Sequence, residues 1–150
     1  MSTSRRDFLQ YAASATGAAA VSAIVPSSLA ARLRDVPRAD RALRILILGG
    51  TGFTGPFQVH YAVARGHHVT VFNRGRRQAD LPASVEHLLG DRNTPEGMDA
   101  IKAAVARGAK WDVVIDNPTT LPFWVRDAGQ ALREATQQYI FISTISVYAD

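Results

Sequence analysis

One segment constrains this chain more than any other: an aliphatic run that ends in closely spaced glycines. The run covers residues 43–48, and Gly49, Gly52 and Gly55 follow it. A strand buried on both faces of a sheet has such a continuous apolar run. The first glycine permits a sharp turn, the second leaves space for a pyrophosphate, and the third lets a helix pack closely on the sheet. The spacing predicts a strand, a phosphate-binding turn and a helix whose N-terminus faces the phosphates.

The residues around these glycines favour this interpretation over a purely structural turn. Pro56 stands near the start of the next stretch, where a helix tolerates proline, and no glycine interrupts the chain from there to Gly66. A second apolar run, residues 68–73, follows directly. We therefore expect a strand–turn–helix–strand unit that binds a dinucleotide, with Phe53 and Thr54 of the turn among the cofactor contacts.

Apolar runs and helix-like stretches alternate along the rest of the chain. Further strands are predicted at residues 85–89, 111–116 and 139–143, and helices at residues 98–107 and 124–135. This alternation predicts an α/β protein with right-handed crossovers. The expected fold is a Rossmann-type doubly wound parallel sheet with strand order 3-2-1-4-5.

The carboxyl ends of the strands carry the candidate ligand contacts, because ligands of such sheets bind there. Asn73 and Arg74 follow the second strand, where an NAD site usually has an acidic residue, and Arg76 and Arg77 lie close by. Arginine favours a 2′-phosphate through its charge and bidentate geometry, so NADP is predicted. NAD is the alternative if these arginines form only a solvated loop.

Three further strand ends supply the remaining predicted contacts. Asp91 follows the third strand, and its carboxylate has three interpretations: it accepts a hydrogen bond from the adenine amino group, caps the next helix or pairs with Arg92. Asn117 follows the fourth strand, where the chain passes over the cofactor. Ser143 ends the fifth strand. All three are predicted cofactor contacts.

Three motifs in order resemble a known family. The glycine turn at residues 49–55, the Gly-Asp pair at residues 90–91 and the segment Phe-Ile-Ser-Thr-Ile-Ser-Val-Tyr at residues 141–148 resemble the extended or atypical short-chain dehydrogenases/reductases. These are the NAD(P)-dependent epimerase/dehydratase group, and the resemblance covers residues 43–150. It implies hydride transfer between a nicotinamide and a carbinol or carbonyl carbon. The implied partner is a small-molecule substrate, with a sugar nucleotide and a homodimer as options.

The resemblance also implies catalytic residues. Thr144 matches the family's catalytic hydroxyl, which would hydrogen-bond the substrate oxygen. The family's Tyr-x-x-x-Lys acid–base pair occurs nowhere in the chain. The sequence stops just after the fifth strand, so we expect the N-terminal part of a longer enzyme, without its later strands and substrate domain and without turnover. The alternative is a non-catalytic module of this fold that binds a dinucleotide or RNA.

The N-terminus predicts an export signal. An arginine pair at residues 5–6, followed by Phe8 and Leu9, precedes a weakly apolar stretch at residues 11–25 and a small-residue cleavage pattern at residues 28–30. These features are typical of a twin-arginine signal peptide. The apolar stretch is too short and too rich in alanine to favour a membrane anchor.

These patterns divide the chain into three predicted parts. Residues 1–30 are the signal peptide, residues 31–42 a charged linker, and residues 43–150 the dinucleotide-binding domain. The predicted location is the bacterial periplasm, with membrane contact only during export.

Composition narrows the function classes. The chain has no cysteine, which excludes disulfides and thiolate chemistry, and no metal-ligand spacing, so no metal site is predicted. Its formal net charge is +4, but the basic residues form no stripe with interleaved aromatic residues. Nucleic acid is therefore not the first interpretation.

Overall fold

The computed structural model describes residue 33 and residues 35–117 and 121–143. Five strands and three helices lie in one compact unit, Asp35–Asp150. In chain order they are β1 (Arg44–Leu48), α3 (Gly55–Ala64), β2 (His68–Asn73), β3 (Glu86–Leu89), α4 (Asp99–Ala106), β4 (Trp111–Asp116), α5 (Pro122–Leu132) and β5 (Thr136–Phe141).

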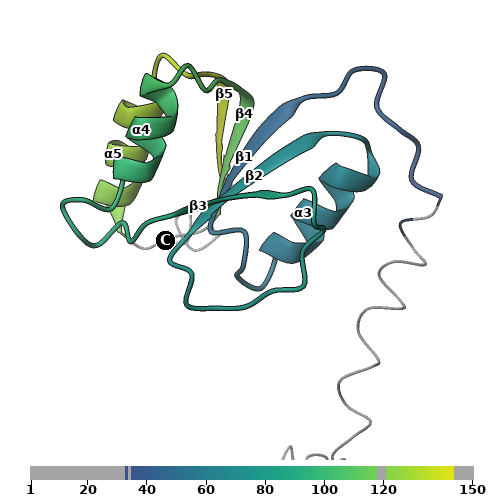
Figure 1. Cartoon of the computed structure of the whole chain (residues 1–150), viewed down its shortest axis with the longest axis horizontal. Helices are drawn as coiled ribbons and strands as arrows, with labels where there is room; N and C mark the ends of the chain where they lie inside the picture. Colours follow the sequence, from purple (N-terminus) through teal and green to yellow (C-terminus); the bar gives the residue numbers. More distant parts are fainter. Residues whose placement is uncertain (1–32, 34, 118–120, 144–150) are drawn as a thin grey trace, which may run out of the picture. The chain divides into compact units, whose positions relative to one another are not determined.

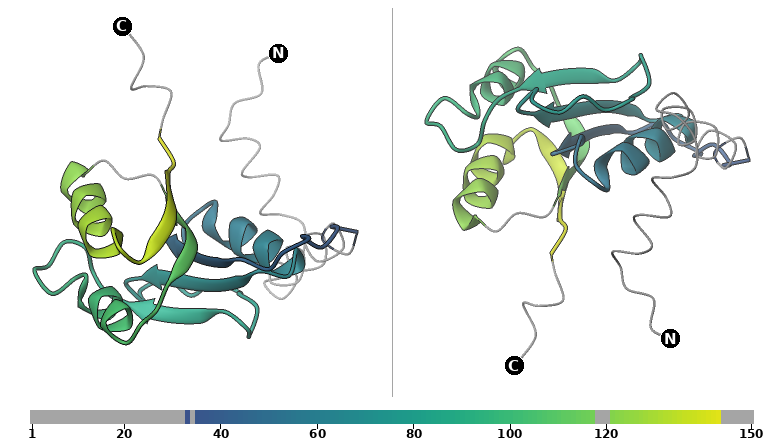
Figure 2. Two further views of the ribbon diagram at one scale, coloured as in Figure 1. Left: turned by 90° about the horizontal axis from the view of Figure 1, so that it is seen from above. Right: turned by 90° about the horizontal axis from the view of Figure 1, so that it is seen from below.

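The five strands form a single parallel sheet in the order β3-β2-β1-β4-β5. Helix α3 covers one face, and α4 and α5 cover the other (Figure 1). Figure 2 shows the same layers from above and below. The predicted fold class and strand order are confirmed. The chain leaves the central β1 toward one edge of the sheet and then returns to β4 on its other side, which opens a crevice at the carboxyl ends.

Strand β1 is the centre of two hydrophobic cores. Ile45 and Ile47 face α3 and pack with Val59 of that helix. Leu46 and Leu48 face the other side, where they belong to the core built with α4 and α5. Because helices cover both faces, every residue of β1 after Arg44 is buried, as its continuous apolar run predicts. Each such side chain contributes on the order of 1.5–3 kcal/mol.

The fifth strand lies earlier in the chain than the sequence predicts. It runs over Thr136–Phe141 rather than residues 139–143, so Ser143 follows the strand instead of ending it. The polar sequence Thr-Gln-Gln concealed its start. β5 is an edge strand of the described sheet and has no buried residue, so polar side chains are compatible with its exposed positions.

The last helix also differs from its predicted bounds. α5 begins at Pro122, a residue tolerated in the first turn, and ends at Leu132. Ala135, predicted as its last apolar contact, is buried from the turn before β5 instead.

The described ranges contain no helix of the length and apolar character that crossing a membrane requires. In the same ranges, no three acidic or histidine side chains come close enough to hold a metal ion.

Candidate functional site

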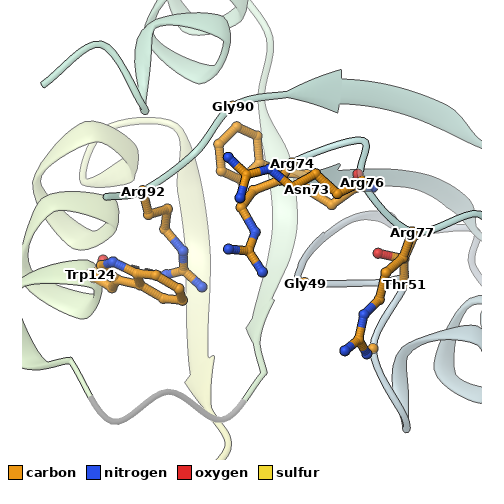
Figure 3. A pocket seen from close by; sticks show the side chains of 11 residues that line it. Gly49, Thr51, Asn73, Arg74, Arg76, Arg77, Gly90, Arg92 and Trp124 are labelled. Carbon is orange, nitrogen blue, oxygen red and sulfur yellow. Dashed lines mark hydrogen bonds between the residues drawn. The ribbon is translucent and has the colours of Figure 1, made fainter. Parts of the chain in front are cut away.

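A pocket of about 270 Å³ lies at the carboxyl ends of β1, β2 and β3, beside α5 (Figure 3). Loops that follow the first three strands form most of its wall, as the strand order requires. Its lining residues are Gly49, Thr51, Gly52, Phe72, Asn73, Arg74, Arg76, Arg77, Gly90, Arg92 and Trp124. Four predicted cofactor contacts are among them: Gly49, Gly52, Asn73 and Arg74.

The glycine turn has the geometry that the sequence predicts. Gly49 has a φ of +83°, in the left-handed region that favours glycine, and its N–H donates to the carbonyl of Phe72 at 2.8 Å. A Cβ atom on Gly55 would lie 2.4 Å from the backbone of Gly50, so only glycine permits this approach of α3 to the turn.

Gly52 is not required by the packing of the protein itself. A Cβ atom there would meet only the carbonyl oxygen of Gly49, at an ordinary 3.5 Å. The residue lines the pocket, and its N–H donates to the same oxygen at 3.1 Å. Gly52 thus borders the pocket without a side chain, in a place where the protein's own packing leaves room.

The end of β2 supplies hydrogen-bond donors and positive charge. The side-chain oxygen of Asn73 accepts a hydrogen bond from the N–H of Gly75 at 2.7 Å, which leaves its buried Nδ2 group without a partner. Arg74 and Arg77 form no ion pair with any described residue, and both side chains line the pocket. This wall suits an anionic ligand rich in acceptors.

Asp91 lies outside the pocket lining and is already engaged. Its Oδ1 accepts hydrogen bonds from the N–H and Nδ2 groups of Asn93, at 3.2 and 2.8 Å, and its Oδ2 lies 3.3 Å from Arg76. The backbone hydrogen bond from Asn93, followed by its side chain and the charges of Arg74 and Arg76, holds the pKa of Asp91 below its usual value.

Two interpretations of Asp91 are therefore wrong. It does not pair with Arg92, which binds Asp116 instead. It does not cap α4, because that helix begins eight positions later, after Met98. The adenine contact stays a prediction.

Asn117 ties three elements together at the end of β4. Its Nδ2 donates to the carbonyl of Leu48 at 3.1 Å, and its Oδ1 accepts from the hydroxyl of Thr54 at 3.4 Å. The amide and the Thr54 hydroxyl thus hold the ends of β1 and β4 against the start of α3.

The remaining predicted residues do not line this pocket. Phe53 projects from the glycine turn and is 92% exposed. Ser143 is exposed beyond β5. Thr144, the predicted catalytic hydroxyl, lies outside the described residues.

The sequence did not predict that Arg92 and Trp124 form a wall of this pocket. The Arg92 guanidinium binds the carboxylate of Asp116 with both terminal nitrogens, at 2.6 and 3.1 Å. It also lies 4.8 Å from the centre of the Trp124 ring. Tyr139 donates to the same carboxylate at 2.6 Å. Burial, reinforced by this hydrogen bond and by the charge of Asp116, raises the pKa of Tyr139 well above its ordinary value.

One signal in the sequence pointed to this network. Asp116 closes the apolar run of β4 and is fully buried, and a buried carboxylate requires a partner. The identity of that partner depends on tertiary structure, since 23 positions separate Asp116 from Tyr139 and 24 from Arg92.

Known proteins match two parts of the chain. Residues 1–26 match the family described as the ubiquitinol-cytochrome C reductase Fe-S subunit TAT signal. The chloroplast stem-loop binding protein of 41 kDa b from Arabidopsis thaliana is 33% identical over 118 residues, which are 70% of this chain and 30% of that protein. The 2′-dehydrokanamycin reductase of Streptomyces kanamyceticus is 36% identical over 77 residues, 51% of this chain and 21% of the reductase. The chain thus spans less than a third of either relative.

Solved structures with the same fold are more distant in sequence. A UDP-galactose 4-epimerase matches with a TM-score of 0.55 and 21% identity, over 71% of this chain and 40% of the enzyme. The Bordetella bronchiseptica enzyme WbmG in complex with NAD matches with a TM-score of 0.54 and 18% identity, over 68% of this chain and 37% of WbmG. A short-chain dehydrogenase/reductase from Veillonella parvula gives a TM-score of 0.57 and 17% identity, over 73% of this chain and 50% of that structure.

These matches confirm the resemblance at the level of the fold and of the N-terminal signal. The chain has the Rossmann-type fold of NAD-dependent epimerases and short-chain dehydrogenases/reductases, preceded in sequence by a segment that matches a twin-arginine signal.

Proposed function

We propose that this chain binds a nicotinamide dinucleotide at the carboxyl edge of its sheet, as the cofactor-binding part of an NAD(P)-dependent epimerase/dehydratase or reductase. The dinucleotide would supply hydride transfer with a carbinol or carbonyl carbon of the substrate. The protein's part is to bind and orient it. A small molecule, with a sugar nucleotide as one option, is the proposed substrate class.

The observation that carries this proposal is that hydrogen-bond donors without an acceptor, together with positive charge, gather around the pocket. Gly52 leaves space that the protein's own packing does not need. Asn73 and Trp124 each bring a buried N–H group without a partner, and Arg74 adds a positive charge. A ligand with phosphates and several acceptor atoms satisfies these groups, and the helix α3 begins three residues beyond Gly52 with its dipole favouring anions.

We further propose that NADP is preferred over NAD. Arg74 and Arg77 line the wall at the end of β2, and neither forms an ion pair with a described residue. A charge-assisted hydrogen bond to a 2′-phosphate is worth about 1.5–3 kcal/mol before solvent screening, so NADP should bind at least about tenfold more tightly. Arg76 contributes less because Asp91 already binds it.

Comparison of the dissociation constants of NADP and NAD in the wild type and in Arg74→Ala tests this preference. The proposal predicts that Arg74→Ala removes most of it without weakening NAD binding. The matched control is Arg126→Ala, an exposed arginine on α5 outside the pocket lining. A preference for NAD, or a preference indifferent to Arg74, would contradict the proposal.

For catalysis, we propose Thr144 as the hydroxyl that hydrogen-bonds the substrate oxygen. Loss of one positioned donor lowers a rate by roughly ten- to a thousandfold, which is the effect expected of Thr144→Ala in a protein that turns over. Cofactor affinity should be unchanged.

A second candidate function is binding of structured RNA. The Arabidopsis relative carries the name of a stem-loop binding protein. In this chain Arg74 and Arg77 are exposed, and Phe53 in the glycine turn is 92% exposed. Arginine and an exposed aromatic ring suit phosphates and unstacked bases. A stem-loop RNA that binds and is not displaced by NADP would favour this candidate.

We also propose that residues 1–30 direct export to the periplasm by the twin-arginine pathway, ahead of the linker 31–42 and the domain 43–150. The match over residues 1–26 supports this proposal.

A further inference from the structure

Arg92 is held in place more firmly than any other pocket arginine. Both terminal nitrogens bind the carboxylate of Asp116, and Nη1 also donates to the carbonyl of Trp124 at 3.4 Å. Its side chain is 8% exposed, and that of Asp116 is fully buried. A bidentate contact of this kind fixes the plane of the guanidinium as well as its position.

The network leaves two N–H groups of Arg92 without a partner among the described residues. A guanidinium has five N–H groups, and the described residues engage three of them. The group at Nε and the second one at Nη2 stay without an acceptor among those residues, and Arg92 lines the pocket. A positive charge on Arg92 is therefore offset by Asp116 while two of its donors stay unpaired.

Trp124 extends the same wall. Its ring stacks beside the Arg92 guanidinium, and its Nε1 group is buried without a partner among the described residues. In Figure 3, Arg92 and Trp124 lie at one end of the pocket, Thr51 and Arg77 lie at the other, and Arg74 lies between them. The end of the pocket formed by Arg92 and Trp124 thus presents N–H donors whose positive charge is offset by Asp116, together with a flat aromatic surface. It does not present a free positive charge.

Stability alone does not account for this buried ion pair. Burying a charged pair removes two ions from water, and an apolar replacement of similar volume is often at least as stable. The hydroxyl of Tyr139 adds a third contact to Asp116 at 2.6 Å, which further restricts the carboxylate. Such a cluster fixes the orientation of the Arg92 side chain.

We propose that Arg92 and Trp124 form the base-binding end of the pocket and that Asp116 and Tyr139 are positioning residues that act through Arg92. The N–H groups of Arg92 that the network leaves unpaired donate to ring nitrogens of a purine, and the Trp124 ring gives the base a flat surface to pack on. This inference rests on the proposed dinucleotide binding and adds the residues that recognise the base. Charge-neutralised donors suit an uncharged ring, whereas the free arginines at the other end suit phosphate.

A double-mutant cycle on NADP binding tests the inference. Arg92→Lys keeps the charge but loses the bidentate geometry, and Tyr139→Phe removes only the hydroxyl. Each should raise the dissociation constant of NADP by about tenfold, the effect of one charge-assisted hydrogen bond. The double variant should be no weaker than Arg92→Lys alone, because Tyr139 acts through Arg92. The matched control Tyr61→Phe, on the exposed side of α3, should bind NADP as the wild type does.

A fluorescence measurement gives an independent readout that needs no change in the network. The chain has two tryptophans, so Trp111→Phe leaves Trp124 as its single indole. Adenosine 2′,5′-bisphosphate, which carries the base without the nicotinamide, should then change the Trp124 emission with the same dissociation constant that calorimetry gives.

The outcomes separate this inference from the proposed function. Unchanged NADP affinity in folded Arg92→Lys and Tyr139→Phe, additive losses in the double variant, or a silent Trp124 during saturable binding would each overturn the inference alone. No binding of NADP or NAD by the wild type would overturn the proposed function and this inference with it.

Discussion

Gly52 and Gly55 stand three residues apart and serve different purposes. A Cβ atom on Gly55 would collide with the backbone of Gly50 at 2.4 Å, whereas one on Gly52 would make an ordinary contact at 3.5 Å. Gly55→Ala should therefore lower the free energy of unfolding by about 3 kcal/mol or more, as a small-to-large change against backbone does. Gly52→Ala should change it by less than about 1 kcal/mol.

Urea denaturation of the two alanine variants measures this difference. Similar losses of stability in both would mean that the turn requires glycine at position 52 for its own folding, and the space above Gly52 would then not indicate a ligand.

His67 makes the stability of the folded state depend on pH. Its Nδ1 accepts a hydrogen bond from the N–H of Leu43 at 3.1 Å, which requires a neutral ring on that side. Burial, followed by the charge of Arg65, lowers the pKa of His67. The unfolded chain therefore takes up a proton below about pH 6.5 while the folded one resists it, so stability is lost as the pH falls.

Comparison with His67→Asn isolates this effect, because the asparagine oxygen can accept the same hydrogen bond without titrating. Between pH 7.5 and pH 5.5 the free energy of unfolding should fall more steeply in the wild type than in the variant. Parallel slopes would mean that His67 does not contribute to the pH dependence.

At the scale of single elements, two glycines in open space should respond in opposite directions to alanine. Gly129 lies inside α5, and Gly108 follows α4 with a φ of +88°; neither would bring a Cβ atom within 4 Å of other groups. Gly129→Ala should stabilise the protein by about 0.5–1 kcal/mol through helix propensity. Gly108→Ala should destabilise it by about 1–2 kcal/mol, the cost of the left-handed conformation.

Thermal melts of both variants check the prediction, since neither glycine lines the pocket and both variants should keep the wild-type affinity for ligands. Destabilisation by Gly129→Ala would show that α5 depends on close packing at that position.

The sequence predicted four strands, β1 to β4, within one residue of their bounds, including the largely exposed β3. The continuous apolar runs of β1, β2 and β4 indicated their positions within one residue, because strands covered on both faces have few polar positions. The start of β5 was misplaced because its first three residues, Thr-Gln-Gln, are polar and carry no apolar signal.

The candidate site was predictable only in part for a related reason. The glycine turn and the arginines after β2 are contiguous in sequence, so their pattern is visible. The wall of Arg92 and Trp124 joins residues 32 positions apart, and Asp116, which holds Arg92, comes from a third part of the chain. Such a cluster exists only once the sheet has formed.

At the scale of the whole molecule, the proposed export predicts a role for the N-terminal arginine pair. Replacement of both Arg5 and Arg6 by lysine should leave most of the protein in the cytoplasmic fraction, because twin-arginine recognition reads the guanidinium pair rather than charge alone. Cell fractionation with immunodetection measures the distribution. Unchanged export of the double variant, or a wild type found only in the cytoplasm, would contradict the proposed periplasmic location.

The central claim is that the glycine turn of the described unit holds a dinucleotide. Titration calorimetry of NADP against the wild type and Gly52→Val tests it most directly, because a valine side chain would fill the space that faces the pocket. We predict saturable binding by the wild type and an increase in the dissociation constant of about a hundredfold in the variant, equivalent to about 3 kcal/mol. Equal dissociation constants in two folded proteins, or no binding of either dinucleotide by the wild type, would contradict the claim.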